Sequence, residues 1–306
     1  MSDLVLLDGG AGRELARMGA PFRQPEWSAL ALMEAPELVL RMHLRFAEAG
    51  ADVITTNSYA IVPFHLGAAR FAARGAQLAE LAGRLAREAA SAAGRTVAVA
   101  GSLPPVCGSY RADLFDREQA RPVLQILVRA LAPHVDHWLA ETLSAIEEAE
   151  LVREVIDAAG IAERPLWLSF TLEDQNAIRG APRLRSGQSV AEAVAAAIRV
   201  RAAAVLFNCS QPEVMQEAVS LARAAIESSR AGLRIGVYAN AFPPQRKDAT
   251  ANDGLCEIRT DLTPEKYLAF ARAWQQSGAG IVGGCCGIGP EHIAALRAGL
   301  RAKADA

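Results

Sequence analysis

The sequence predicts an α/β fold in which eight parallel strands close into a (β/α)8 TIM barrel, as a single domain over residues 1–306. Short apolar runs with many β-branched residues recur eight times, and a longer stretch rich in alanine and leucine follows each run. This alternation is typical of a parallel sheet, because a helix carries the chain back between neighbouring strands. A length of 306 residues also suits eight such units.

The predicted strands are apolar runs that stand between glycine, proline and charged residues. A parallel barrel buries both faces of its strands, so runs that are largely apolar are expected. In chain order they are Leu4–Asp8, Asp52–Asn57, Thr96–Ser102, Val135–Glu141, Pro165–Thr171, Ala203–Cys209, Arg234–Ala239 and Gly280–Gly284.

The predicted helices follow these strands and are rich in alanine and leucine at helical spacing. Four of the eight begin with proline, which a first helical turn accepts because the missing N–H has no partner there. In chain order they are Pro36–Ala49, Leu66–Ala93, Gln119–Ala132, Leu143–Ala159, Val190–Arg201, Pro212–Ser229, Pro264–Ser277 and Pro290–Ala302.

The longest irregular segments all lie between a strand and the helix that follows it: Pro104–Glu118, Leu172–Ser189 and Asn240–Thr263. In a barrel, such connections build the rim of the active site. The alternative is a doubly wound open sheet. The dinucleotide-binding pattern Gly-x-Gly-x-x-Gly does not follow the first strand, and the barrel is therefore favoured.

Composition excludes several classes of function. Hydrophobic residues make up 51% and charged residues 22%, which is typical of a globular protein with a large core. The net charge of −2 provides no basic field, so neither nucleic acid nor an anionic membrane is an expected partner. No apolar run reaches the roughly 18 residues of a membrane helix, and the start lacks a signal peptide's basic region. We expect a cytoplasmic protein; a homo-oligomer is compatible with these data.

The cysteines carry the strongest functional signal. Gly283-Gly284-Cys285-Cys286-Gly287 ends the eighth strand, and Cys209 ends the sixth. Flanking glycines let the backbone turn tightly, so that two adjacent sulfur atoms can face one point. Three thiolates from two strand ends predict a Zn²⁺ site, and a fourth position left open is typical of catalytic zinc. A reducing compartment also favours metal-binding thiols over disulfides.

Other interpretations of the cysteines exist. Cys107 or Cys256, both in predicted loops, would close a purely structural zinc site as the fourth ligand. The adjacent cysteines would alternatively be a redox pair, or simply small buried residues. We favour the open zinc site and expect packing roles for Cys107 and Cys256.

Two carboxylates end other predicted strands at the same mouth: Asp8 after the first and Glu141 after the fourth. Such a pair serves as the acid and base of a glycosidase, or it binds a substrate ammonium group. Beside a thiolate-bound metal, ammonium binding is the more economical interpretation. A helix N-cap role for Asp8 and a rim salt bridge for Glu141 are the structural alternatives.

Further substrate-binding candidates end strands at this mouth: Gly9, Gly10, Asn57, Ser102 and Thr142. The Gly9 and Gly10 amides are expected to face a carboxylate. Tyr59, Tyr110 and Phe242 are candidates for an aromatic wall around a cationic methyl donor.

None of the five histidines is assigned to the metal. We expect His43 and His292 on the surface because they lie in helical patterns. His65 and His134 lie at predicted helix ends, and His137 lies within the fourth strand, where a core position is expected.

Three motifs together are similar to one known family. Asp8-Gly9-Gly10, Asn208-Cys209 and Gly283-Gly284-Cys285-Cys286-Gly287 resemble the zinc-dependent homocysteine S-methyltransferases, and the resemblance spans nearly the whole chain. It implies that Cys209, Cys285 and Cys286 bind zinc, with the homocysteine thiolate in the fourth position. It also implies that Asp8 and Glu141 hold the amino group of homocysteine.

The resemblance implies methylation of L-homocysteine to methionine, without a protein nucleophile. The expected donor is S-methylmethionine, then S-adenosylmethionine or betaine. Alternatives are a methylcorrinoid partner, another acceptor thiol, or a non-catalytic zinc or redox barrel. Two segments depart from the family pattern, and both lie where the donor is expected. Gly101-Ser102-Leu103-Pro104-Pro105 replaces Gly-Ser-Leu-Gly-Pro, and Tyr238-Ala239-Asn240-Ala241-Phe242 replaces Tyr-Pro-Asn-Ser-Gly.

Overall fold

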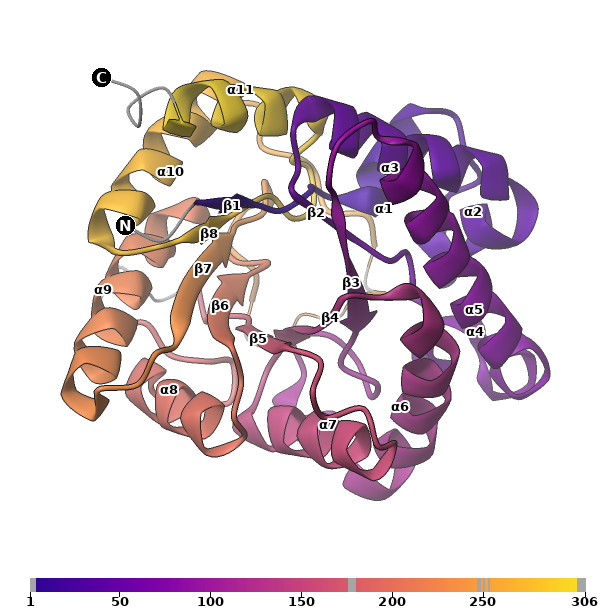
Figure 1. Ribbon diagram of the computed structural model, residues 1–306, viewed down its shortest axis with the longest axis horizontal. Helices are drawn as coiled ribbons and strands as arrows, with labels where there is room; N and C mark the ends of the chain where they lie inside the picture. The colour runs from indigo at the N-terminus through magenta and orange to yellow at the C-terminus, as the bar shows by residue number, and fades with distance from the viewer. Residues whose placement is uncertain (1–3, 176–179, 247–248, 250, 253, 302–306) are drawn as a thin grey trace.

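The computed structural model describes residues 4–175, 180–246, 249, 251–252 and 254–301. Its strands form one eight-stranded parallel sheet in the order β1-β8-β7-β6-β5-β4-β3-β2 (Figure 1). An isolated parallel bridge between Leu7 and Val53 joins the two outer strands of that order. The backbone N–H of Asp52 also donates to Leu6 O at 2.7 Å, and the N–H of Asp8 donates to Val53 O at 3.0 Å. The predicted (β/α)8 barrel is therefore confirmed.

The strands lie close to the predicted ranges. They are β1 (Val5–Leu6), β2 (Val53–Thr55), β3 (Ala98–Leu103), β4 (His137–Leu143), β5 (Leu166–Phe170), β6 (Ala204–Asn208), β7 (Arg234–Tyr238) and β8 (Ile281–Val282). The clearest error concerns Leu143, which was expected to start a helix but still pairs with Phe170 in the sheet. The register shifts between Ala140 and Leu143, and this irregularity re-aims the intervening side chains of Glu141 and Thr142.

Most helices were predicted, and three have the predicted bounds: α3 (Pro36–Ala49), α9 (Pro212–Ser229) and α10 (Pro264–Ser277). The other predicted helices are α5 (Ala68–Ala92), α6 (Arg117–Leu131), α7 (Ile146–Ala158), α8 (Val190–Arg199) and α11 (Pro290–Arg301). Ala302, the predicted last residue of α11, lies outside the described residues, as do parts of the predicted loops Leu172–Ser189 and Asn240–Thr263.

Three short helices were missed: α1 (Ala11–Arg17), α2 (Ser28–Glu34) and α4 (Pro63–Leu66). Two 3-10 turns, η1 (Ala112–Leu114) and η2 (Ala132–His134), complete the described elements. Helices of four to seven residues contain too few turns for a periodic apolar pattern to be recognised.

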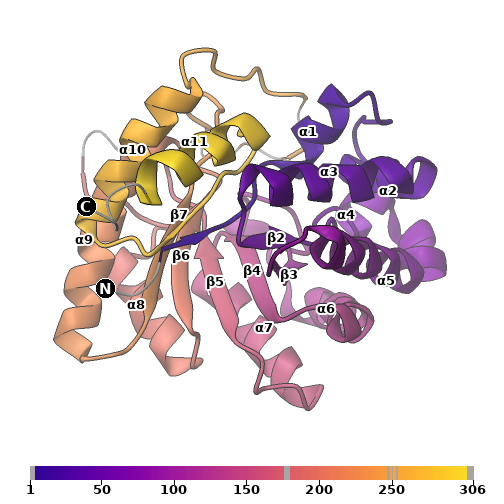
Figure 2. The same cartoon turned by 45° about the horizontal axis from the view of Figure 1, so that its top comes forward.

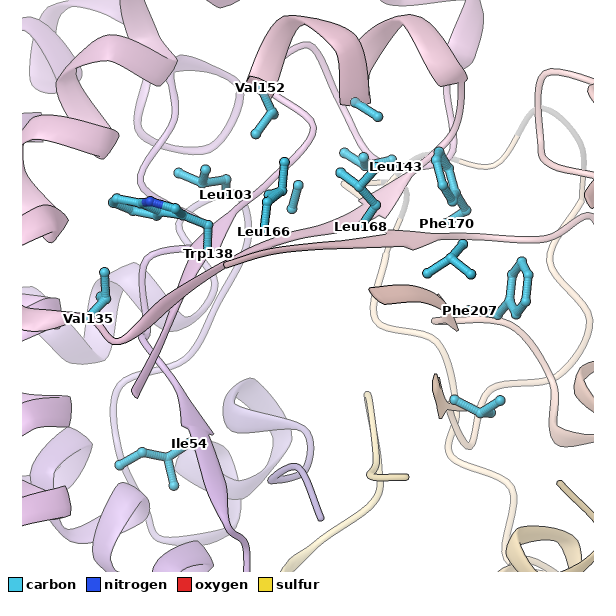
Figure 3. Packing of buried hydrophobic residues seen from close by; sticks show 14 of the residues in the cluster. Ile54, Leu103, Val135, Trp138, Leu143, Val152, Leu166, Leu168, Phe170 and Phe207 are labelled. Carbon is cyan, nitrogen blue, oxygen red and sulfur yellow. The ribbon is translucent and has the colours of Figure 1, made fainter. Parts of the chain in front are cut away.

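The core has two layers because successive strand residues point to opposite faces. Leu139 lies in a cluster inside the barrel with Trp167 and Leu206. Its neighbour Trp138 points outward and packs between the sheet and the surrounding helices, as does Phe207 (Figure 3). Among the described residues, no helix has both the length and the apolar composition needed to cross a bilayer.

The long connections after the strands meet at one end of the barrel. The connection between β7 and α10 runs towards α1 (Figure 2). There the Arg13 guanidinium donates to Cys256 O at 2.5 Å, and the Gln24 amide donates to Ala251 O at 3.0 Å. The Trp27 indole N–H donates to Asn252 Oδ1 at 2.8 Å. This connection therefore covers the end of the barrel at which the polar residues that follow the strands lie.

Candidate functional site

The three predicted metal ligands come together. Cys209 follows β6, Cys285 and Cys286 follow β8, and their sulfur atoms all lie within 4.8 Å of one another. All three are free thiols; Cys209 is buried and the other two are half-buried. Three thiolates are a ligand set typical of zinc and other thiophilic metals. The cluster is therefore a potential metal site.

Glycine is required where the cysteine turn approaches the rest of the chain. A Cβ atom on Gly10 would lie 2.5 Å from Cys285 O, and one on Gly283 would lie 2.4 Å from Leu7 Cβ. Both distances are shorter than real contacts of this kind. The glycines noted in the sequence thus let the turns after β1 and β8 pack directly against each other.

Cys209 has the most polar surroundings of the three thiols. Its sulfur lies 2.9 Å from the Tyr110 hydroxyl and 3.8 Å from Asn240 Nδ2. Hydrogen bonds from Cys285 and Cys286, and then from Tyr110, lower the pKa of Cys209 well below that of an ordinary thiol. These contacts therefore stabilise the thiolate form of Cys209.

A cavity of about 190 Å³ opens beside the sulfur atoms. The three cysteines, Asp8 and Glu141 all line it. Six aromatic side chains also line it: Phe22, Trp27, Tyr59, Tyr110, Tyr238 and Phe242. Its size suits a small metabolite, and its polar groups converge from separate strands, as in ligand sites generally.

Asp8 is buried and forms no ion pair within the described part of the chain. Its carboxylate accepts hydrogen bonds from the backbone N–H of Thr55 at 2.7 Å and from the Thr55 hydroxyl at 3.0 Å. Burial raises the pKa of Asp8 to about 7, and the nearby charge of Glu141 adds to this rise. An N-cap role is not observed, because Gly10 occupies the N-cap of α1.

Glu141 has a similar environment. Its carboxylate accepts hydrogen bonds from the Ser102 hydroxyl at 2.5 Å and from the Tyr238 hydroxyl at 3.2 Å. Burial raises the pKa of Glu141 to about 7, although both hydrogen bonds oppose the rise. Within the described residues, neither the buried Asp8 nor the half-buried Glu141 forms an ion pair with a basic side chain, and such carboxylates are suited to receive a cationic ligand.

Asn208 links the carboxylate side of the cavity to the sulfur side, and sequence analysis assigned it no such role. Its Oδ1 accepts from the Thr142 backbone N–H at 3.0 Å and from the Ser169 hydroxyl at 2.8 Å. Its Nδ2 donates to the Thr142 hydroxyl at 2.9 Å and lies 4.0 Å from the Cys285 sulfur. These contacts fix Thr142, and with it the end of β4, relative to the cysteines.

The other predicted substrate-binding residues fall into two groups. Gly9, Gly10, Asn57 and Thr142 line the cavity, whereas Ser102 is buried behind Glu141 and contacts it directly. The Gly10 amide donates to Ile288 O at 2.9 Å and is therefore not open to a carboxylate, contrary to expectation. The reason is the close packing of the turns after β1 and β8.

All three predicted donor-wall residues line the cavity. The Tyr59 hydroxyl lies 2.6 Å from Ser109 Oγ, whereas that of Tyr110 points to Cys209. An arginine side chain lies over one ring face of Tyr110 and another over one ring face of Phe242. Arg185 lies 4.8 Å from the Tyr110 ring centroid, and Arg13 lies 5.8 Å from that of Phe242.

The surface prediction for two histidines was wrong. His43 is buried because it shares the inner face of α3 with Val39, Met42 and Phe46, at helical spacing. His292 is also buried, and its ring accepts a hydrogen bond from the Gly289 N–H. His137 lies in the core as expected, 4.1 Å from Trp167 between ring centroids.

A family model described as Homocysteine S-methyltransferase matches residues 5–300. The chain belongs to the homocysteine S-methyltransferase family. It is similar to Homocysteine S-methyltransferase of Escherichia coli (strain K12), with 32% identity covering 97% of this chain and 95% of the relative. It is also similar to Selenocysteine Se-methyltransferase of Brassica oleracea var. italica, with 29% identity covering 95% and 87% respectively.

A solved structure of this family has the same fold. The metallated form of the homocysteine methyltransferase MmuM from Escherichia coli matches with a TM-score of 0.75 at 29% identity. The match covers 97% of this chain and 96% of that one. Its oxidized form matches with a TM-score of 0.76 at 28% identity. This protein is accordingly an enzyme of the homocysteine S-methyltransferase family with a thiol cluster suited to a metal.

Strained backbone conformations are concentrated around the cavity. Six non-glycine residues of the described chain have positive φ angles, and four of these line the cavity: Trp27, Tyr110, Thr142 and Cys209. Their φ angles of 50° to 67° are costly for residues with side chains. Sequence patterns do not reveal such conformations, so the strain at Trp27 and Thr142 was not predicted.

The buried carboxylates make stability depend on pH. The pKa of Asp8 is 3.8 in a model peptide and about 7 in the fold. The folded state therefore binds more protons between these values, and stability falls as pH rises through this window. Asp8→Asn removes this cost. From pH 5 to pH 8, we expect the variant to gain roughly 1–3 kcal/mol of unfolding free energy relative to wild type.

Urea denaturation at both pH values measures this difference. Glu80→Gln, at an exposed position on α5, is the matched control and should follow the wild-type curve. Parallel curves for wild type and Asp8→Asn would show that Asp8 is not held in a charge-destabilising environment.

Proposed function

We propose that the protein transfers a methyl group from a sulfonium donor, first of all S-methylmethionine, to the thiolate of L-homocysteine and so forms methionine. S-adenosylmethionine and betaine are the next candidate donors. The observation that carries the proposal is one cavity lined by a three-thiol cluster and by two carboxylates, of which Asp8 is buried and Glu141 half-buried. A single amino acid with a side-chain thiol presents the complementary groups, an ammonium and a sulfur.

The thiol cluster is proposed to hold zinc through Cys209, Cys285 and Cys286. Three protein ligands are typical of catalytic zinc sites, which keep a position for substrate. When bound, zinc lowers the pKa of a coordinated thiol, which is near 8.5 in water, and keeps it as a nucleophilic thiolate. Cys107 and Cys256 lie outside the cluster.

Asp8 and Glu141 are proposed to bind the homocysteine ammonium group. An ammonium beside them compensates the charge that burial disfavours, so binding lowers their pKa values again. Ser102 and Tyr238 hold the Glu141 carboxylate, and Thr55 holds that of Asp8, so that neither needs to reorient. Gly9, Asn57 and Thr142 complete the proposed wall around the amino acid.

The aromatic wall is proposed to receive the donor cation. Tyr59 is the favoured contact, because Tyr110 and Phe242 each carry an arginine over one ring face. The acceptor thiolate then attacks the methyl carbon in line. The electron pair of the breaking C–S bond stays on the donor sulfur, and no proton moves in this step. Because an anion and a cation become neutral products, exclusion of water by the wall favours the transfer.

A second candidate acceptor is selenocysteine. Two relatives, at 29% and 28% identity, are named as selenocysteine methyltransferases. Selenocysteine also presents an ammonium group and a nucleophilic chalcogen, so the same cavity groups are suited to it. Another acceptor thiol, a methylcorrinoid partner as donor and a non-catalytic zinc barrel are further alternatives that the assays below separate.

Removal of a cluster cysteine tests the metal proposal. Cys209→Ala and Cys285→Ala should each lose stoichiometric zinc and reduce methyl transfer at least about a thousandfold, since the loss removes a ligand that no neighbour replaces. Zinc is measured by mass spectrometry of the metal and activity by methionine formation. Cys107→Ala, at a half-buried cysteine outside the cluster, is the control and should keep both. Full activity in a zinc-free Cys209 variant contradicts the proposal.

A donor panel tests the reaction. With homocysteine as acceptor, we expect S-methylmethionine to give the highest kcat/KM, above S-adenosylmethionine and betaine, with methylcobalamin inactive. Parallel assays with selenocysteine as acceptor compare the two acceptors directly. Transfer from methylcobalamin alone would favour the corrinoid alternative, and no transfer from any donor would favour a non-catalytic barrel.

Measuring KM separately for homocysteine and for the donor tests the proposed role of the carboxylates. Glu141→Gln removes one of two charges proposed to bind the ammonium, and should raise the KM for homocysteine about ten- to a hundredfold, or ~1.4–2.7 kcal/mol. The KM for the donor should change little. Glu147→Gln, at an exposed residue of α7 that does not line the cavity, is the control. A rise in the KM for the donor alone would indicate that Glu141 contacts the donor instead of homocysteine.

A further inference from the structure

A fully buried ion pair lies beside the cavity, and the proposed chemistry does not use it. The side chains of Asp174 and Arg185 are 0% and 1% exposed, and Arg185 Nη2 lies 3.3 Å from Asp174 Oδ1. Buried ion pairs add little net stability, because desolvation offsets their attraction. A buried pair next to a functional site is therefore a candidate for positioning other groups of that site.

The pair joins two of the long connections. Both residues lie between β5 and α8, and both contact the connection between β7 and α10. Asp174 Oδ1 accepts from the Gln245 backbone N–H at 3.0 Å, and Arg185 Nη1 donates to Gln245 O at 3.3 Å and Arg246 O at 3.4 Å. The Arg185 guanidinium is thereby fixed from several sides.

The guanidinium contacts a third connection, that between β3 and α6, through Tyr110. It lies 4.8 Å from the Tyr110 ring centroid, within the range of a cation–π contact. Tyr110 has a φ of 67°, an unfavourable conformation for a bulky residue, so the surroundings must hold it there. The result of this conformation is a hydroxyl 2.9 Å from the Cys209 sulfur.

We infer that the Tyr110 hydroxyl donates a hydrogen bond to the Cys209 thiolate of the metal-loaded enzyme, and that the Arg185–Asp174 pair positions Tyr110 for this contact. The inference rests on the proposed function, because it requires a metal on the three cysteines. Three thiolates place more negative charge at the site than one divalent ion balances. A hydroxyl donor on one of them reduces that excess, and such outer contacts tune metal affinity.

Tyr59 lines the same cavity as Tyr110, but its hydroxyl has a different partner. The Tyr59 hydroxyl lies 2.6 Å from Ser109 Oγ and makes no hydrogen bond to a sulfur atom of the described residues. Tyr59 therefore offers a matched control, because Tyr59→Phe removes the same group from the same cavity.

The test uses the full-length protein loaded with Co²⁺, whose sulfur-to-metal charge-transfer absorption reports on the thiolates. In Tyr110→Phe, loss of the hydrogen bond raises the energy of the sulfur lone pairs, so the band should move to longer wavelength. Zinc affinity, measured by competition with a chelator, should fall roughly tenfold to a hundredfold. In Tyr59→Phe, the band and the zinc affinity should equal those of wild type.

Arg185 is tested by a double-mutant cycle. Arg185→Lys keeps the charge beside Asp174 but loses the planar stack, so it should shift the band in the same direction as Tyr110→Phe. In the double variant, Arg185→Lys should add no further shift, because the hydroxyl it positions is gone. The variant that combines Asp174→Asn with Arg185→Met removes both charges together, and it should shift the band in the same direction as Arg185→Lys.

The outcomes separate this inference from the proposed function. A wild-type protein that takes up no Co²⁺ contradicts the metal site itself. A normal wild-type band that is unchanged, together with zinc affinity, in Tyr110→Phe contradicts the hydroxyl contact and leaves the metal site standing. Equal additive shifts in the double variant contradict the positioning role of Arg185.

Discussion

The site depends on how the backbone of Asp8 is held between two other strands. Its N–H donates to Val53 O at 3.0 Å, and its C=O accepts from the Gly284 N–H at 2.9 Å. These two bonds close the barrel at β1 and join the carboxylate residue to the turn that carries Cys285 and Cys286. The absence of side chains on Gly10 and Gly283 allows this approach. Without it, the ammonium-binding and metal-binding groups of the proposed mechanism would not share a cavity.

The cavity concentrates features that oppose folding. Two carboxylates are shielded from water and have raised pKa values, and strained backbone conformations occur at residues such as Thr142 and Cys209. A large core supports these costs, because the sheet is covered by apolar side chains both inside the barrel and beneath the helices. The rigid strands thus hold polar groups in positions that the groups themselves disfavour, as expected of a binding site that is preorganised.

Sequence analysis predicted the barrel and the main polar groups because both depend on local patterns. Alternating apolar runs define strands and helices, and the strand ends of a parallel barrel meet at one end, which brings Cys209 to Cys285. The contacts of the long connections were not predictable in this way. The Tyr110 hydroxyl and the Arg185–Asp174 pair meet through residues distant in sequence, and no periodic pattern records such contacts. The burial of His43 was missed for a different reason: a histidine is polar, but this one shares the apolar inner face of α3.

The central claim is that the three cysteines hold a metal with one position left for the acceptor sulfur. X-ray absorption at the zinc edge, with and without homocysteine, measures this directly. The account predicts three sulfur ligands near ~2.3 Å in the free enzyme and four after homocysteine is added. Four sulfur ligands in the free enzyme, or three in both states, would contradict it.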